Sequence, residues 1–399
     1  MEKLQDRREF LFTLLGAAMG LGGVLRFPGL CYSFGGAFIF AYALFLAVVG
    51  LPLLYAELKL GKSCRAPFPT AIKKVNRRAG ALGWAACVNS ALIAVYYSAV
   101  IARLACKTGT FYFETNCGFS ADLSWLVALF AALCWLLLGI MLRRGMRAMA
   151  RLARIAVVCQ VALLTVLALR GLIFGNSAQA LKKIFAIESG SFLNAGMWRE
   201  ALAQSLLSLS VAAGVMPSFS NAMPPASSEL KCAARVIAAN FIGGNLSSVA
   251  LLTIVYGCAL NDNVGTNGLY NAFVLYPVAL SNAFLSGTVS GIFGTLFFAS
   301  LTLTAFVSAL SLLGAIYAPL SHAFKLSPRR VTILLCAVCA LLSVAPVMSF
   351  DFIRIADDIT CGIIAPVLAL AEIVLFSCRA LLTMRRSGVK MNLWKTLKS

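Results

Sequence analysis

The stretch GAAMGLGGVLRFPG, residues 16–29, lies inside a long apolar run and yet holds five glycines, an arginine and a proline. Glycine frees the backbone dihedrals and packs no side chain, so several glycines within one turn weaken a helix. In a bilayer an unwound segment leaves backbone groups unpaired, which is tolerated where they line a polar cavity or a ligand site. The alternative is that these small residues let two helices pack closely.

The composition indicates an integral membrane protein. Hydrophobic residues make up 61% of the 399 residues, charged residues 12%, and the mean hydropathy is +0.89. A soluble core could not bury so much apolar surface. Runs long enough to cross the roughly 30 Å of hydrocarbon predict ten transmembrane helices near 10–31, 36–57, 82–105, 122–142, 152–174, 197–222, 235–258, 288–318, 331–349 and 358–379. The short alternating segments of a membrane barrel are missing, so we expect an all-α protein with one transmembrane domain over 1–399.

The positive charge is distributed unevenly along the chain. The net charge is +20, and 26 of the 34 Lys and Arg lie in the loops and tails that would share one side of the membrane. Positive residues favour the cytoplasmic side. Both termini, with the short basic tails 1–8 and 380–399, are therefore expected in the cytoplasm. The protein is expected in the cell (inner) membrane. This distribution argues against a nucleic-acid partner.

A second interruption falls five spans after the first. The run AQSLLSLSVAAGVMP, residues 203–217, places polar residues, Gly214 and Pro217 inside the sixth expected span. Spans one and six open two successive sets of five, and an odd number of spans per set inverts the second set relative to the first. Broken helices at matching positions of inverted halves are typical of transporters with a substrate site near the bilayer midplane. We therefore predict a five-plus-five inverted repeat that works by alternating access.

Several charged residues lie at membrane depth, where such groups are usually paired or functional. Arg26 follows the first break, and Asp357 and Asp358 open the tenth span at the same outer face. A contact between Arg26 and Asp357 is expected to close the site to the outside. Glu57 and Glu372 are either structural carboxylates bonded to unwound backbone or part of the transport mechanism.

The cysteines and the one histidine of the sequence do not indicate a metal site or a catalytic site. Cys336 and Cys339 form a CxxC inside an apolar span, where core packing outweighs metal or redox chemistry. Cys106 and Cys117 are expected in or beside an external loop, where a disulfide is possible. The only histidine is His322, and HExxH and GxSxG motifs are absent from the sequence. An enzyme is therefore the least favoured function.

The sequence resembles the neurotransmitter:sodium symporter family. The run GAAMGLGGVLRFPGLCYSFGGAFIFAYALFLAVVGLPLLYAELKLG is similar to the family's first two spans, and the likeness continues in order along almost the whole chain. It includes VYYS at 95–98, MWREALAQSLLSLS at 197–210, GLYNAFVLYPVALSNA at 268–283 and FGTLFFASLTLTAFVSALSLL at 293–313. The resemblance implies a LeuT-like fold and an amino-acid substrate.

The resemblance also implies which residues hold the substrate. Its carboxylate is expected at the backbone of Leu21 and Gly22 and at the Tyr97 hydroxyl, and its amine at carbonyls of Ala18 and of the broken sixth span near Ser210. The implied side-chain pocket contains Ile93, Leu207, Ala213, Ser308 and Leu312. Relatives often carry an aromatic residue at the position of Ala213, so a roomier pocket for a large neutral or aromatic amino acid is expected. Gln204 is implied as a residue of the outer gate that orients Arg26.

Two sodium sites are implied, each with one oxygen fewer than the family pattern. The first set is Ala18, Ser208 and Asn240, with Gly23 where relatives have Asn. The second set is Gly16, Met19, Thr304 and Ser308, with Val307 where relatives have a hydroxyl. Hard cations need several oxygen ligands, so water or the substrate carboxylate would have to fill each gap. Gly244, at the position that distinguishes chloride-dependent relatives, leaves chloride and proton coupling open.

The cytoplasmic gate departs from the family pattern as well. The basic residue and the tryptophan that relatives carry before span one fall near Met1 and Leu4, the aromatic residue after span six is Ala222, and the acid after span eight aligns with His322. The inner seal is therefore expected to differ from that of the relatives. The favoured function is sodium-coupled symport of a neutral amino acid or related amine. The alternatives are a sodium-independent transporter of the same fold, working by proton coupling or exchange, and a non-transporting receptor or channel.

Overall fold

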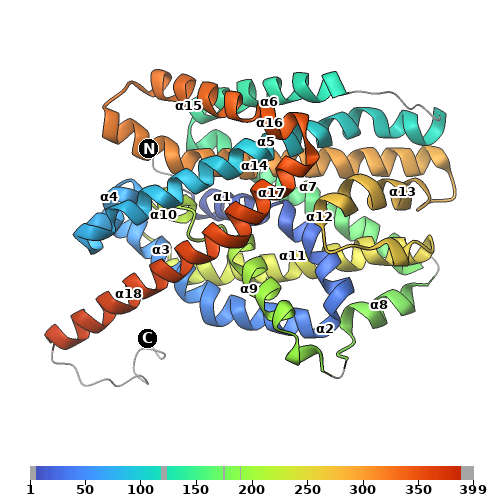
Figure 1. Ribbon diagram of the computed structural model, residues 1–399, viewed down its shortest axis with the longest axis horizontal. Helices are drawn as coiled ribbons and strands as arrows, with labels where there is room; N and C mark the ends of the chain where they lie inside the picture. Colours follow the sequence, from blue (N-terminus) through green and yellow to red (C-terminus); the bar gives the residue numbers. More distant parts are fainter. Residues whose placement is uncertain (1–5, 118–123, 174–175, 189, 388–399) are drawn as a thin grey trace.

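The computed structural model describes residues 6–117, 124–173, 176–188 and 190–387, with backbone alone at 124 and 378–387. These ranges are helical and contain no β-strand, which confirms the all-α prediction. The long helices run side by side along the longest axis of the molecule (Figure 1). Within these ranges, seven helical stretches are long and apolar enough to cross a membrane: Gly22–Cys64, Arg77–Cys117, Trp125–Arg144, Met146–Ile173, Glu229–Gly257, Gly287–Phe324 and Phe350–Ser377.

The first expected span consists of two helical segments. Helix α1 (Arg7–Ala18) begins after Asp6, whose carboxylate accepts a hydrogen bond from the Arg8 amide at 2.9 Å. The backbone leaves the helix at Met19 (φ −81°, ψ 63°). It resumes as a π-helical turn, η1 (Gly22–Arg26), that leads into α2 (Phe27–Phe45). The glycine-rich stretch quoted above is thus where the helix is interrupted.

The first and second expected spans meet at a kink within α2. Gly35 has φ 59° and ψ −150°, a conformation that suits glycine. The Gly36 amide donates to the Ala186 carbonyl at 2.8 Å, and a Cβ atom on Gly35 would lie 2.5 Å from that same oxygen. The chain continues through η2 (Leu46–Gly50) into α3 (Leu51–Cys64).

The sixth expected span is also two segments. Helix α9 (Ala195–Leu209) ends where Ser210 and Ala212 take left-handed φ values of 50° and 56°, and α10 (Val215–Ser220) starts after Gly214 at φ 68°. Side chains from other helices stabilise this break: the Ala212 amide donates to Glu57 Oε1 at 2.7 Å, and the Ser90 hydroxyl donates to the Ala213 carbonyl.

The remaining helices complete the bundle around these two breaks. They are α4 (Phe68–Val75), α5 (Gly80–Cys117), α6 (Ser124–Arg144), α7 (Met146–Ile173), α8 (Ser177–Phe185), α11 (Glu229–Gly257), α12 (Gly268–Tyr270), α13 (Tyr276–Ser281), α14 (Gly287–Phe324), α15 (Pro328–Leu342), α16 (Val344–Met348), α17 (Phe350–Ile359) and α18 (Ala365–Ser387). Short turns complete the chain: η3 (Arg77–Ala79), η4 (Ser191–Leu193), η5 (Asn261–Asn263), η6 (Asn271–Leu275) and η7 (Thr360–Ile364). Helices α5 and α14, each 38 residues long, pack against each other, and Gly294 of α14 makes room for the buried ring of Phe111.

The possible disulfide between Cys106 and Cys117 is wrong. Both cysteines are free thiols, and both lie on α5, which continues well past the expected end at 105. Eleven residues of helix separate their Cα atoms by about 16 Å, whereas a disulfide joins Cα atoms roughly 4.4–6.8 Å apart. Cys336 and Cys339 are also free, and Cys339 is buried.

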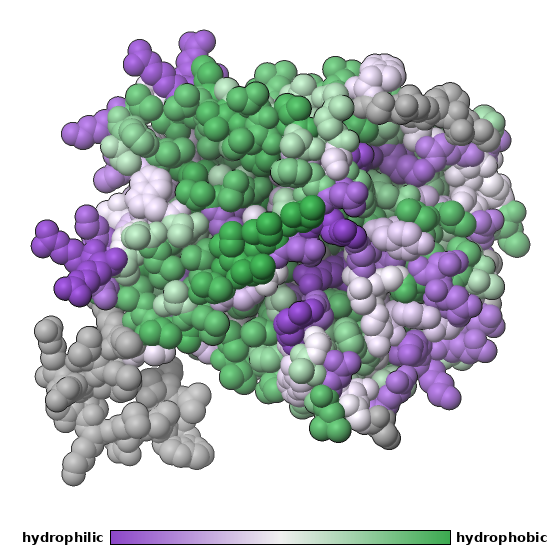
Figure 2. Space-filling model, viewed as in Figure 1, coloured by the Kyte–Doolittle hydropathy of each residue, from purple (hydrophilic) through white to green (hydrophobic). Residues whose placement is uncertain are grey.

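The molecular surface fits a membrane environment. Large apolar side chains are exposed on the outer helices, among them Trp125 and Leu136 on α6 and Leu341 on α15. Apolar residues cover much of the face shown in Figure 2, and hydrophilic residues gather at its ends and around a hollow beside α17 and α9. Helix α4 and the far end of α18 lie at the same end of the molecule (Figure 1). The chain is an integral membrane protein by length and apolarity of its helices.

Candidate functional site

The two helix breaks border one pocket of about 600 Å³. The Ser210 hydroxyl in the second break donates to the Ala17 carbonyl beside the first break at 2.8 Å, which ties the two breaks together. Helices α5, α14 and α17 supply the other walls, and residues 266–269 line the pocket as well. All ten residues expected to contact a substrate line this pocket: Ala18, Leu21, Gly22, Ile93, Tyr97, Leu207, Ser210, Ala213, Ser308 and Leu312.

The first break offers both signs of backbone polarity. The N–H groups at the start of the segment after Leu21 have no acceptor within that helix, and the helix dipole adds positive potential there. Two carbonyls of the segment are already occupied: Gly22 accepts from Gln204 Nε2 at 3.2 Å, and Gly23 accepts from the Ser247 hydroxyl at 2.6 Å. The N–H groups at the start of this segment are therefore the polar backbone groups suited to an anionic group in the pocket.

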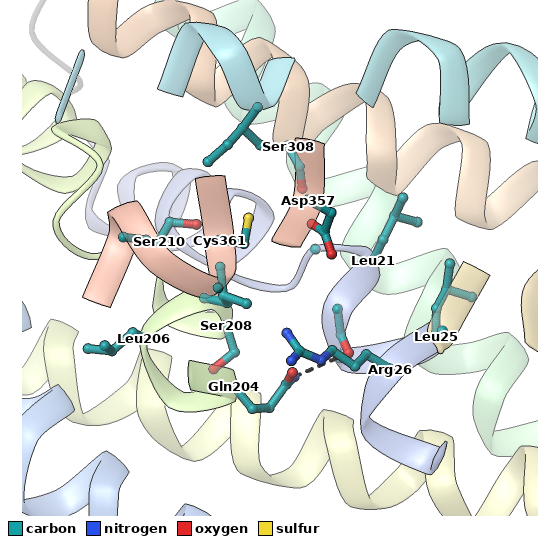
Figure 3. Close-up of a pocket in the computed structure, with 18 of the residues that line it drawn as sticks. Leu21, Leu25, Arg26, Gln204, Leu206, Ser208, Ser210, Ser308, Asp357 and Cys361 are labelled. Carbon is teal, nitrogen blue, oxygen red and sulfur yellow. Dashed lines mark hydrogen bonds between the residues drawn. The ribbon is translucent and has the colours of Figure 1, made fainter. Parts of the chain in front are cut away.

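The wall of the pocket that is expected to face outward carries charged and polar side chains. Arg26, Gln204 and Asp357 reach toward the cavity from η1, α9 and α17 (Figure 3). The expected contact between Arg26 and Asp357 is not formed: Arg26 Nη2 lies 2.6 Å from Glu200 Oε2, and Asp357 Oδ1 accepts from the Tyr96 hydroxyl at 2.7 Å. Gln204 Nε2 donates to the Gly22 carbonyl, and Gln204 Oε1 accepts no hydrogen bond from Arg26, so the expected contact that orients Arg26 is not formed. Glu200 takes this role because it lies one helical turn before Gln204, on the same side of α9.

The residues expected to bind sodium are divided between two cavities. Ala18, Ser208 and Ser308 line the large pocket, whereas Met19, Asn240 and Thr304 line a second cavity of about 20 Å³. Gly20 and Gly23 border both cavities.

The remaining expected positions around sodium are packed tightly. A Cβ atom on Gly16 would lie 2.6 Å from Cβ of Ala153, and Val307 is buried against the same region of α7. The Ser208 hydroxyl shares a hydrogen bond with the Tyr42 hydroxyl at 2.9 Å. The Ser308 hydroxyl is buried without a partner among the described side chains.

Glu57 and Glu372 form a buried pair behind the second break. Both are 0% exposed, and Glu57 uses one carboxylate oxygen to accept from the Ala212 amide at 2.7 Å. Glu372 interacts with Glu57, and neither of its oxygens has a hydrogen-bond partner among the described groups. Two carboxylates can share a hydrogen bond only when one holds a proton. The structural interpretation of Glu57 therefore matches its contacts.

The end of the molecule that the charge distribution predicts to be cytoplasmic is held by contacts between α3 and the chain after α10. Lys62 Nζ donates to the Ser227 carbonyl at 2.7 Å and pairs with Glu229 at 3.0 Å. The Arg65 guanidinium donates to the Asn221 carbonyl at 3.1 Å. Ala222 is buried beside these contacts, His322 lies in the last turn of α14, and the expected positions Met1 and Leu4 fall outside the described residues.

Three site residues were missed at the sequence level. Glu200 and Tyr96, the partners of Arg26 and Asp357, line the pocket, and Gln160 lines the smaller cavity. Glu200 could have been found, because it is the acid four residues before Gln204 and therefore lies on the same side of the helix. A lone glutamine such as Gln160 in an apolar span carries no comparable pattern.

The chain is similar to a family of transporters along nearly its whole length. The model of the sodium:neurotransmitter symporter family matches residues 1–125 and 109–378. An uncharacterized sodium-dependent transporter of Methanocaldococcus jannaschii is 24% identical, with 92% of this chain and 79% of that protein covered. The sodium-dependent neutral amino acid transporter B(0)AT3 of Mus musculus is 24% identical over 70% of this chain and 52% of its own length.

The chain is also similar to a third relative and to a solved structure. The sodium-dependent serotonin transporter of Drosophila melanogaster is 25% identical over 71% of this chain and 54% of its own length. The chain thus spans about half the length of the animal relatives named here. The crystal structure of MhsT in complex with L-phenylalanine has a TM-score of 0.83 at 20% identity, with 100% of this chain and 95% of that chain covered. The fold is therefore LeuT-like, and the chain belongs to the sodium:neurotransmitter symporter family.

Proposed function

We propose that the protein is a sodium-coupled symporter that carries a neutral amino acid, or a related amine, across the cell membrane by alternating access. The observation that carries this proposal is the pocket of about 600 Å³ between the two helix breaks, which all ten expected substrate residues line. Relatives named as sodium-dependent neutral amino acid transporters support the substrate class.

The pocket suits a zwitterion. The substrate carboxylate faces the N–H groups at Leu21 and Gly22 and accepts from the Tyr97 hydroxyl, because all three residues line the pocket and the two N–H groups lie at the positive end of a helix. The substrate amine faces carbonyl groups of Ala18 and of the break after α9. Ile93, Leu207 and Leu312 surround the side chain, and the small Ala213 leaves room for a large one.

The proposed alternating access rests on an inferred arrangement of the helices. We infer ten membrane spans in two inverted sets of five, with α1–η1 and α9–α10 as the discontinuous members and both termini in the cytoplasm. The ion pair of Arg26 with Glu200 and the Asp357 side chain lie on the outer wall of the pocket. The outer gate closes when Arg26 and Asp357 meet across the bound substrate, and the contacts of Lys62 and Arg65 open when the inner gate opens.

A sodium-independent transporter is the second candidate. Gly23 and Val307 supply no side-chain oxygen, and the expected sodium ligands are divided between two cavities. Substrate exchange or proton coupling would need neither sodium site.

The deciding experiment tests substrate and ion together. Binding of each of the twenty amino acids to purified protein is measured in sodium and in choline medium, and uptake of the best ligand is then followed in liposomes with an inward sodium gradient. We expect sodium to strengthen binding and to drive accumulation. Equal uptake in both media would favour the sodium-independent transporter, and binding without uptake would favour a receptor.

A further inference from the structure

The small cavity of about 20 Å³ lies between the first helix break and helices α7, α11 and α14. Its volume holds about one water molecule or one ion. Three polar side chains from three helices line it, Gln160, Asn240 and Thr304, together with the backbone at Met19, Gly20 and Gly23. No charged side chain of the described chain lines it.

Gln160 is a buried polar residue of this cavity whose amide lacks one of its hydrogen-bond partners among the described groups. It lies in the middle of α7 and is 3% exposed. Its Oε1 accepts from the Thr304 hydroxyl at 3.4 Å, and its Nε2 has no partner among the groups that the structure describes. A glutamine amide can be placed in two orientations that exchange its oxygen and its nitrogen, and the correct orientation is decided from the hydrogen bonds it makes. In the turned orientation Nε2 donates to Thr304, and Oε1 occupies the unpartnered position.

The neighbouring groups offer oxygens as well. The amide nitrogen of Asn240 already donates to the Val236 carbonyl of its own helix at 3.1 Å, which leaves Oδ1 as the atom available to the cavity. Met19 and Gly20, at the interrupted backbone of the first span, also line the cavity.

We propose that Gln160 Oε1, Asn240 Oδ1, Thr304 and the broken backbone of the first span form the site of one monovalent cation, with Gln160 supplying an oxygen that Gly23 and Val307 do not. The inference rests on the sodium coupling proposed above. Neutral oxygens favour a monovalent ion, because divalent cations are usually held by carboxylates. The cation stabilises the break, and since Gly20 and Gly23 also border the large pocket, it strengthens amino-acid binding there.

The test compares variants of α7. Gln160→Leu removes the proposed ligand, Gln160→Glu replaces it with a charged oxygen donor of the same length, and Thr165→Val serves as the matched control. Thr165 lies on the same helix, is exposed and donates only to its own helix at Val161, 2.8 Å away. Binding of radioactive sodium without amino acid, and the sodium concentration for half-maximal amino-acid binding, are measured for each variant.

We expect Gln160→Leu to raise the half-maximal sodium concentration at least tenfold, Gln160→Glu to lower it, and Thr165→Val to leave it unchanged. Sodium binding by both Gln160 variants equal to that of the parent protein would overturn the assignment while leaving sodium coupling intact. If amino-acid binding by the parent protein does not depend on the sodium concentration, the proposed sodium coupling is wrong. If Gln160→Leu does not fold, the direction of the shift in Gln160→Glu decides the question.

Discussion

Arg26 illustrates how a single side chain at the pocket mouth depends on its partner. The Arg26 side chain is 25% exposed, and its Nη2 lies 2.6 Å from Oε2 of Glu200, whose side chain is 21% exposed. Charge-assisted hydrogen bonds of this kind are stronger than exposed ion pairs, because less water competes for the charges. Glu200 therefore fixes the position from which Arg26 reaches across the pocket.

Glu200→Gln is expected to slow transport several-fold, because the neutral amide holds Arg26 more weakly, with a loss of about 1 kcal/mol of pairing energy. The control is Arg199→Gln, since Arg199 contacts the same carboxylate but is 80% exposed. Uptake rates in liposomes measure both. Equal rates for Glu200→Gln and the parent protein would show that Glu200 does not position Arg26.

Ala213 lines the pocket and is expected to set its width. A phenylalanine at this position fills space that the alanine leaves open, because Ala213 lines the cavity and is only 8% exposed. Ala213→Phe is expected to weaken binding of aromatic amino acids at least tenfold and to spare small ones. Competition binding with phenylalanine and alanine measures the difference, and an equal loss for both would contradict this role.

At the level of elements, the break after α9 depends on a carboxylate from α3. Glu57→Leu leaves the Ala212 amide without its acceptor, and an unpaired buried donor costs about 1–3 kcal/mol. Glu57→Gln keeps an acceptor oxygen and can donate to Glu372, so it is expected to cost much less. Thermal unfolding of the purified variants measures both, and equal melting temperatures would refute the structural role.

The kink in α2 depends on Gly35. Gly35→Ala is expected to destabilise the protein by more than about 1 kcal/mol, because its φ is positive and the new Cβ would meet the Ala186 carbonyl. Gly190→Ala is the control, since Gly190 also has a positive φ of 88°, but a Cβ atom there would have no described neighbour within 4 Å. A chemical unfolding series separates the two, and equal losses would mean that the contact with Ala186 is unimportant.

For the molecule as a whole, the charge distribution predicts the orientation in the membrane. Residues 260–267 are expected outside, and residues 325–327, at the basic end of α14, in the cytoplasm. Alkaline phosphatase, active only outside the cytoplasm, is fused after Asp262 or after Ser327 in a bacterial host. Activity is expected from the first fusion only, and the reverse pattern would overturn the orientation.

The sequence by itself determined the all-α class, the family and the position of both breaks, because hydropathy and glycine content act over short distances along the chain. The end of α5 was not predicted from the sequence, because Lys107, Thr110 and Glu114 make that segment polar. In the structure the Glu114 carboxylate accepts hydrogen bonds from both other side chains along the same helix. Local pairing thus kept a polar segment helical as far as Cys117.

Only the tertiary structure decided which charged and polar groups meet. Arg26 had several acids in reach by sequence, and the orientation of α9 selected Glu200 over Asp357. Gln160 looked like an isolated polar residue until α7, α11 and α14 enclosed a cavity with it. Partners of this kind depend on how distant helices pack, and packing is a property of the folded chain that no short stretch of sequence encodes.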